Sequence, residues 1–143
     1  MRNNKFHLTT FILIILIFLF SNTIIESDQE VTAENLRNLV PGSWLSERID
    51  MDGFILNMNM GYNFEKNGSG YLFSIKNQKW IKVDDLTWEI KENSIIIKKH
   101  ASDKITIYTV NQIDENIMKV RYFSDDGHKV VQIFKKTVEN LKP

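Results

Sequence analysis

FILNMNMGYNFE, residues 54–65, is the stretch of the chain that shows its folding pattern most clearly. Its even positions are apolar from Phe54 to Phe64, whereas its odd positions carry Asn, Gly or Glu, with Ile55 as the exception. Successive side chains of a β-strand point to opposite faces, so this spacing gives one apolar face and one solvated face. No helix would group these residues, and the sequence therefore predicts a strand here.

Similar short segments follow, separated by turn residues. Asn67-Gly68 is a typical hairpin turn, after which Tyr71, Phe73 and Ile75 are expected to continue the apolar face. Counting residues 43–49 as the first strand and 54–65 as the second, the chain has eight predicted strands, the others at 71–75, 86–91, 94–99, 104–113, 118–122 and 128–136. Residues 77–83, around Trp80, are expected to be an extra piece or a long loop.

This order predicts an all-β fold, an eight-stranded antiparallel up-and-down β-barrel with a short N-terminal helix. Closing the sheet removes both exposed edges, and eight strands enclose a space that side chains just fill or that holds one small ligand. Several segments are too short for a barrel that spans a membrane. The helix has N-cap candidates in Ser27 and Thr32 and is expected to end at Pro41-Gly42.

Residues 1–27 have the composition of a secretory signal peptide. Arg2 and Lys5 precede ten uncharged apolar residues, 11–20, and polar residues follow. An uncleaved anchor spanning residues 8–25 is the alternative, and it would be the only contact with a membrane. Both interpretations place the domain outside the cytoplasm, in the periplasm or secreted. The expected division is 1–27 signal peptide, 28–41 linker and short helix, 42–137 barrel domain and 138–143 C-terminal tail.

Composition excludes several classes of function. With 18 Lys+Arg against 18 Asp+Glu, the chain has no net charge to attract nucleic acid. It has no cysteine, which rules out disulfides, thiolate metal sites and cysteine nucleophiles. His100 and His128 fall in predicted turns without ligand spacing. The pairs at 84–85 and 125–126 are best explained as turn carboxylates, so the sequence predicts no enzyme, no metal and no cofactor.

Gly42-Ser43-Trp44 follows a short helix and opens the first strand, and in this place it resembles the opening motif of the lipocalins and their small bacterial lipocalin-like relatives. Phe64 with Gly68 and Gly70, the strand around Trp88, and the final Ile133-Phe134-Lys135-Lys136 are also similar to that family. The resemblance implies that Gly42 and Trp44 are structural and that Trp44 closes the barrel base. It also implies a basic residue over Trp44, assigned to Lys135 with Lys136 as the alternative. The family's Thr-Asp-Tyr triplet is missing.

Two functions fit these observations. In the first, a monomeric barrel binds a small apolar or amphipathic ligand in a cavity whose expected lining residues are Met58, Met60, Tyr62, Phe73, Trp88, Tyr108 and Tyr122. Methionine adapts to irregular ligands, and Tyr and Trp add polar tips to an apolar wall. The same residues could instead simply fill the barrel, since interiors pack densely. A filled barrel would act as an inhibitor or protein-interaction module through residues 50–53 and Trp80.

Overall fold

The computed structural model describes residues 31–137, which fold into one helix and nine strands. Each strand of the sheet runs antiparallel to its neighbours, in the order β2-β1-β3-β4-β5-β6-β7-β8-β9, and β1 also pairs with β9. Their bounds are α2 (Ala33–Leu39), β1 (Gly42–Met51), β2 (Phe54–Leu56), β3 (Met60–Phe64), β4 (Ser69–Lys76), β5 (Lys79–Lys91), β6 (Ser94–Lys99), β7 (Ile105–Ile113), β8 (Ile117–Phe123) and β9 (Lys129–Lys136).

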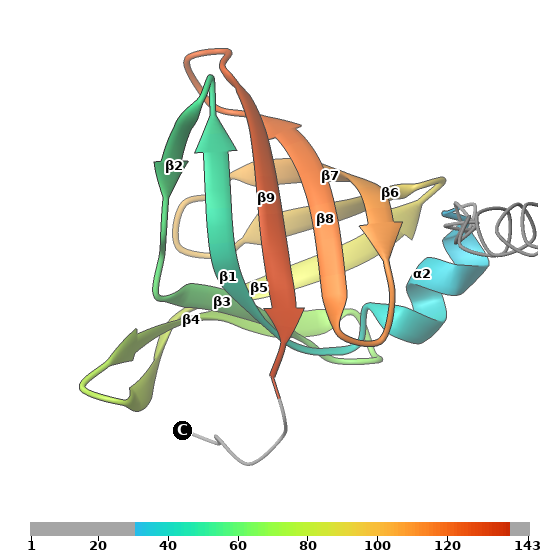
Figure 1. The fold of residues 1–143 in the computed structure, drawn as a ribbon. Coiled ribbons are helices and arrows are strands. Elements are labelled where there is room, and N and C mark those ends of the chain that lie inside the picture. Colours follow the sequence, from blue (N-terminus) through green and yellow to red (C-terminus); the bar gives the residue numbers. More distant parts are fainter. Residues whose placement is uncertain (1–30, 138–143) are drawn as a thin grey trace, which may run out of the picture.

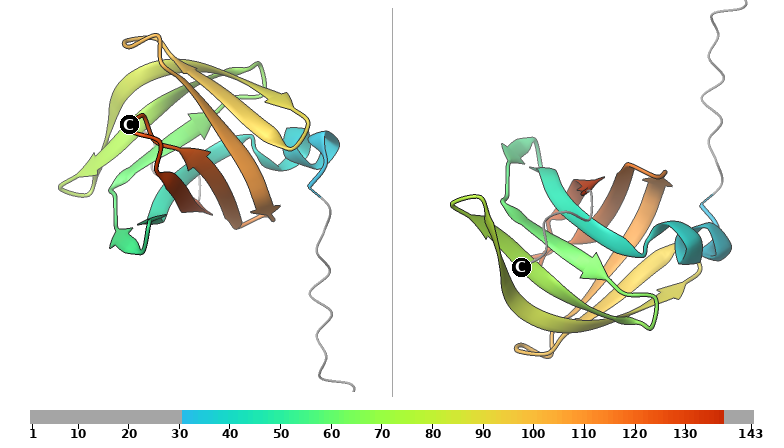
Figure 2. Two further views of the ribbon diagram at one scale, coloured as in Figure 1. Left: turned by 90° about the horizontal axis from the view of Figure 1, so that it is seen from above. Right: turned by 90° about the horizontal axis from the view of Figure 1, so that it is seen from below.

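The β1–β9 pairing closes eight of these strands into a barrel, and β2 is an additional strand paired with β1 (Figure 1). Seen from above and from below, the strands curve around a common interior, and α2 lies beside one end (Figure 2). The predicted eight-stranded antiparallel barrel with a short helix is therefore confirmed.

The helix α2 closes one end of the barrel, called the base below. Thr32 is its N-cap, with its hydroxyl accepting a hydrogen bond from the Asn35 amide at 3.2 Å, whereas Ser27 lies outside the described residues. Leu36 and Val40 are fully buried in the same cluster as Trp44. The Trp44 Nε1 donates to the Val40 carbonyl at 2.8 Å, which ties the helix end to the first strand.

The prediction of one continuous strand over residues 54–65 was wrong. The structure divides it into β2 and β3, which pair with different parts of β1. The alternation holds in β3, where Tyr62 and Phe64 are buried, but Phe54 is 74% and Leu56 49% exposed. Among the described strands β2 pairs only with β1, so nothing covers its apolar side chains.

Residues 77–83 form part of a hairpin, in which the Asn77-Gln78 turn connects β4 to β5. Tyr71 and Phe73 were expected to face the interior, but they lie on the outer face. Leu72 pairs with the inward-facing Tyr62 and therefore faces inward too, so its neighbours Tyr71 and Phe73 face outward. The rings of Phe73 and Trp80 stack at 3.9 Å between centroids.

Gly61 makes this outer packing fit. A Cβ at this position would lie 2.1 Å from the Trp44 carbonyl oxygen and 2.5 Å from Cζ of Phe73. The missing side chain thus lets an aromatic ring lie against the outside of the barrel.

The interior has a packed base and an emptier opposite end, called the mouth below. The fully buried side chains gather with Trp44 toward the base and include Phe64, Leu86, Ile95, Ile97, Val110, Val120 and Phe134. Because the base is packed, any binding site inside the barrel is expected at the mouth.

No helix within residues 31–137 has the length and apolarity needed to cross a membrane.

Candidate functional site

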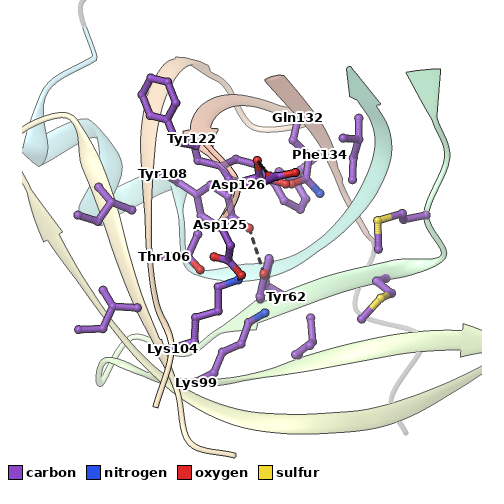
Figure 3. Close-up of a pocket in the computed structure, with 18 residues that line it drawn as sticks. Tyr62, Lys99, Lys104, Thr106, Tyr108, Tyr122, Asp125, Asp126, Gln132 and Phe134 are labelled. Atoms are coloured by element: carbon purple, nitrogen blue, oxygen red, sulfur yellow. Dashed lines mark hydrogen bonds and ion pairs between the residues drawn. The ribbon is translucent and has the colours of Figure 1, made fainter. Parts of the chain in front are cut away.

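A cavity of about 710 Å³ occupies the mouth of the barrel (Figure 3). Its inner wall is formed by side chains from β3, β7, β8 and β9, among them Tyr62, Tyr108, Tyr122 and Phe134. Ile49 of β1 and Leu72 of β4 add apolar surface. The cavity has the size of a site for one small molecule, since such pockets measure roughly 300–1,000 Å³.

Two tyrosine hydroxyls meet at the floor of this cavity. The Tyr62 and Tyr108 hydroxyl oxygens lie 3.1 Å apart, and either can donate to the other. Each hydroxyl has one hydrogen, so this bond uses one and leaves the other without an acceptor among residues 31–137. The floor can therefore donate a hydrogen bond to a ligand that carries an oxygen acceptor.

Burial keeps these hydroxyls protonated. It raises the pKa of Tyr108 well above its ordinary value, and the neighbouring Tyr62 raises it further. Burial also raises the pKa of Tyr62, although the hydrogen bond from Tyr108 opposes this shift. The pair thus acts as a neutral donor near neutral pH.

The ladder between β7 and β8 stops short of the mouth, and the resulting gap is called the β7–β8 seam. The paired residues run only from Thr109 opposite Arg121 to Ile113 opposite Met118. The mouth ends of both strands lie beyond this ladder, and their side chains Ile105, Ile107 and Phe123 line the cavity while remaining exposed. A ligand could therefore reach the cavity through the side of the barrel as well as through its open end.

Charged residues surround the mouth. Lys99 ends β6 and Lys104 precedes β7, and the Lys99 amide donates to the Lys104 carbonyl at 3.0 Å. The Lys104 Nζ lies 2.6 Å from Oδ2 of Asp125, which links the two sides of the seam. Lys99 has no such carboxylate partner in the described part of the chain, and burial, followed by the nearby Lys104, lowers its pKa.

The structure brings together five of the seven predicted ligand-binding residues. Met58, Met60, Tyr62, Tyr108 and Tyr122 all line the cavity. Phe73 does not, because it lies on the outer face against Trp80. Trp88 lies elsewhere too, in a separate cleft beside α2, where its Nε1 donates to the Ser69 carbonyl at 2.9 Å.

The lysines of the mouth were missed by the sequence analysis, although a signal for one of them was present. Alternation in β6 places Lys99 two residues after Ile97 and four after Ile95, both of which are fully buried inside the barrel. The same periodicity that predicts the strand thus places a lysine on its inner face.

The basic residue over Trp44 is Lys136, and its assignment to Lys135 was wrong. The Lys136 Nζ lies 5.0 Å from the centre of the Trp44 ring and donates to the Leu39 carbonyl at 2.9 Å. Its stem passes Gly42, where a Cβ would lie 2.9 Å from Cε of Lys136. Lys135 points outward, because strand alternation places neighbours on opposite faces, and its Nζ is 3.2 Å from Oε1 of Glu47.

The His128 ring contacts two aspartates at the mouth. Its Nδ1 lies 2.6 Å from Oδ2 of Asp52, and its Nε2 lies 3.4 Å from Oδ2 of Asp126. These contacts connect the β1–β2 turn to the β8–β9 turn. Within residues 31–137, no three histidine or carboxylate side chains gather closely enough to hold a metal ion.

The solved structures that are similar to this fold include crystal structures of two bacterial proteins. A lipocalin-like protein from Bacteroides uniformis superposes with a TM-score of 0.54 at 17% sequence identity, over 68% of this chain and 97% of the other. An uncharacterized protein from Bacteroides eggerthii gives a TM-score of 0.52 at 16% identity, over 68% and 98%. Neither a protein-family model nor a curated protein matches the sequence. The chain therefore has a lipocalin-like fold, as the motif around Trp44 implied.

Proposed function

We propose that this protein is an exported, non-catalytic barrel that binds one small apolar or amphipathic molecule in the cavity at its mouth. The cavity itself, about 710 Å³ with an aromatic wall, is the observation that carries the proposal. Burying apolar ligand surface there would contribute about 25 cal/mol for each Å² removed from water, before the costs of association. The free hydroxyl hydrogen at the floor would orient a ligand that has an oxygen acceptor.

The side chains of the cavity support binding more than catalysis. A general base must be able to accept a proton near neutral pH, and the raised pKa values of Tyr62 and Tyr108 make them donors instead. Asp125 is already engaged by Lys104, and Asp126 accepts a hydrogen bond from Ser124. Export rests on the composition of residues 1–27 and is tested by fractionating cells that express the full chain.

The cavity volume favours this proposal over a filled barrel that works through its outer loops. A packed interior would leave far less than the ~300 Å³ expected of a ligand site. Trp80, which the second function needed as an exposed contact, is only 8% exposed and stacks on Phe73.

Binding of a neutral fluorophore, N-phenylnaphthylamine, to the full chain tests the proposal. Its emission should rise on binding and fall again when decanol is added as a competitor. Thr106→Phe should weaken binding because Thr106 lines the cavity, whereas Thr109→Phe should leave it unchanged because Thr109 lies on the outer face of the same strand. Native mass spectra after incubation with a lipid extract provide an independent readout. An empty protein in both measurements, or equal effects of the two variants, would overturn the proposal.

A further inference from the structure

The two lysines at the mouth face the cavity from opposite sides of one turn. Lys98 pairs with Ile105 in the β6–β7 ladder, so the next pair outward is Lys99 with Lys104. Directly opposite residues share a face of the sheet, and this face is the inner one because Ile97, two residues before Lys99, is fully buried. Both lysines line the cavity, and both are drawn toward its interior in Figure 3.

Within residues 31–137, only one of these two cations has an anionic partner. Like charges directly opposite in a sheet destabilise it, so a carboxylate close to both would be favourable. Asp125 reaches Lys104 at 2.6 Å, but Lys99 has no salt bridge with any residue in the range 31–137. Asp84, the other carboxylate near Lys99, accepts a hydrogen bond from the Ala101 amide. Asp126 also lines the cavity, but it accepts a hydrogen bond from Ser124 and lies 3.4 Å from Nε2 of His128. The mouth thus contains a half-buried ammonium group without a partner.

Resting on the function proposed above, we infer that the ligand is an amphiphile with a single anionic group, which binds between Lys99 and Lys104 while its apolar part extends toward Tyr62 and Tyr108. A carboxylate or sulfate on an apolar body of roughly ten carbon atoms has this chemistry. Charge-assisted hydrogen bonds to the ammonium groups would hold it. The anion competes with Asp125 for Lys104, and the Asp125 side chain then turns to solvent.

The test compares three probes with the same chain and different head groups: decanoate, decanol and decyltrimethylammonium. Their affinities for the full chain are measured by displacement of N-phenylnaphthylamine. Decanoate should bind about tenfold more tightly than decanol, and the cation more weakly than decanol. Equal affinities of decanoate and decanol would overturn the inference and leave the proposed function intact. Failure of all three probes and of the fluorophore would overturn both.

Two variants test the role of the lysines. Lys99→Met should lower the affinity for decanoate about tenfold relative to the affinity for decanol. The matched control is Lys119→Met, on the outer face of β8, which should change neither. Asp125→Asn should strengthen decanoate binding, because it frees Lys104. A loss of decanoate binding in Asp125→Asn, or no loss in Lys99→Met, would contradict the assignment.

The pH dependence gives a further readout. The charged groups around Lys99 are Lys104 before β7, Asp84 on β5, and Asp125 and Asp126 in the β8–β9 turn. Burial, followed by Lys104, lowers the pKa of Lys99 in the free protein, and Asp84 and Asp125 oppose this shift. A bound anion favours the protonated form, so binding takes up a proton. Decanoate affinity should therefore be complete below the free-state pKa of Lys99 and fall as the pH rises through it, while decanol affinity stays constant. A decanoate affinity that does not fall over this range would contradict the inference.

Discussion

Replacing Lys136 by methionine should destabilise the barrel much more than the same replacement at its neighbour Lys135. The Lys136 ammonium donates to the Leu39 carbonyl at the C-terminal end of α2, at 2.9 Å, and lies 5.0 Å from the centre of the Trp44 ring. Among the residues that the structure describes, the Lys135 ammonium makes one exposed ion pair, with Glu47 at 3.2 Å. Methionine keeps most of the aliphatic stem in both variants, so the comparison isolates the charge.

The magnitude follows from these contacts. A hydrogen bond from a charged group is worth about 1.5 kcal/mol at the low end of its range, and a cation over an aromatic ring adds about 0.5 kcal/mol. Part of this is offset because burial lowers the pKa of Lys136, which means that folding removes some water from its charge. The expected loss is about 1–2 kcal/mol, and it should lower Tm by about 5–10 °C. An exposed pair such as Lys135–Glu47 contributes about 0–1 kcal/mol.

Urea unfolding of the full chain, followed by tryptophan fluorescence, measures both free energies. The slope of the free energy against urea concentration should be the same in both variants, since the folded surface does not change. Lys135→Met should stay close to the unmodified protein. An equal loss in the two variants, or no loss in Lys136→Met, would refute the reasoning that the contact with Trp44 and the helix end stabilises the base.

Three further outcomes are expected. Gly61→Ala should lose about 1–3 kcal/mol, because the new Cβ would lie 2.1 Å from a backbone oxygen, and urea unfolding measures the loss. The pKa values of Tyr62 and Tyr108 are raised by folding, so their contribution to stability is fully present below about pH 10 and is lost as the pH rises further. A variant with Phe at both positions should therefore lose less stability than the unmodified protein between neutral and alkaline pH. Trp80→Phe should lower the free energy of unfolding by less than about 1 kcal/mol, because the buried Trp80 Nε1 has no hydrogen-bond partner in the described residues. Trp80→Ala should lower it by about 3 kcal/mol, because the ring that stacks on Phe73 is lost.

The sequence predicted the barrel because its periodicity reflects burial directly. Tyr62 and Phe64 alternate with polar residues and are buried, and the Thr32 cap and the end of the helix near Pro41 are local signals that the structure retains. The site was predicted in part, since the alternation also determines which side chains face inward. Met60, Tyr62, Tyr108 and Tyr122 were identified on this basis.

The residues that were misplaced depend on neighbours that the sequence does not reveal. Phe54 and Leu56 are exposed on β2, an edge strand that pairs only with β1 among the described strands. Nothing in their own pattern distinguishes them from Tyr62. Phe73 lies outside because Gly61, in another strand, leaves room for its ring. Lys99 was not predicted to face the cavity, although it continues the inward-facing positions of Ile95 and Ile97, because charged residues at strand ends are usually solvated.

The incomplete ladder at the β7–β8 seam has a mechanical consequence. Moving the mouth ends of these strands apart breaks no row of backbone hydrogen bonds between them. The links that would have to open include the Lys104–Asp125 pair and the contact of the Tyr108 and Tyr122 rings, whose centroids are 4.9 Å apart. An exposed ion pair of this kind contributes only about 0–1 kcal/mol. The barrel could therefore widen to admit a bulky guest while its closed end, held by Trp44 and the helix, stays rigid. The backbone amide of Ile107 points across the seam, because alternate amides of a strand face opposite neighbours and the Val110 amide donates to the Asn93 carbonyl on the β6 side at 2.9 Å. Deuterium should therefore enter the Ile107 amide well before the Val110 amide.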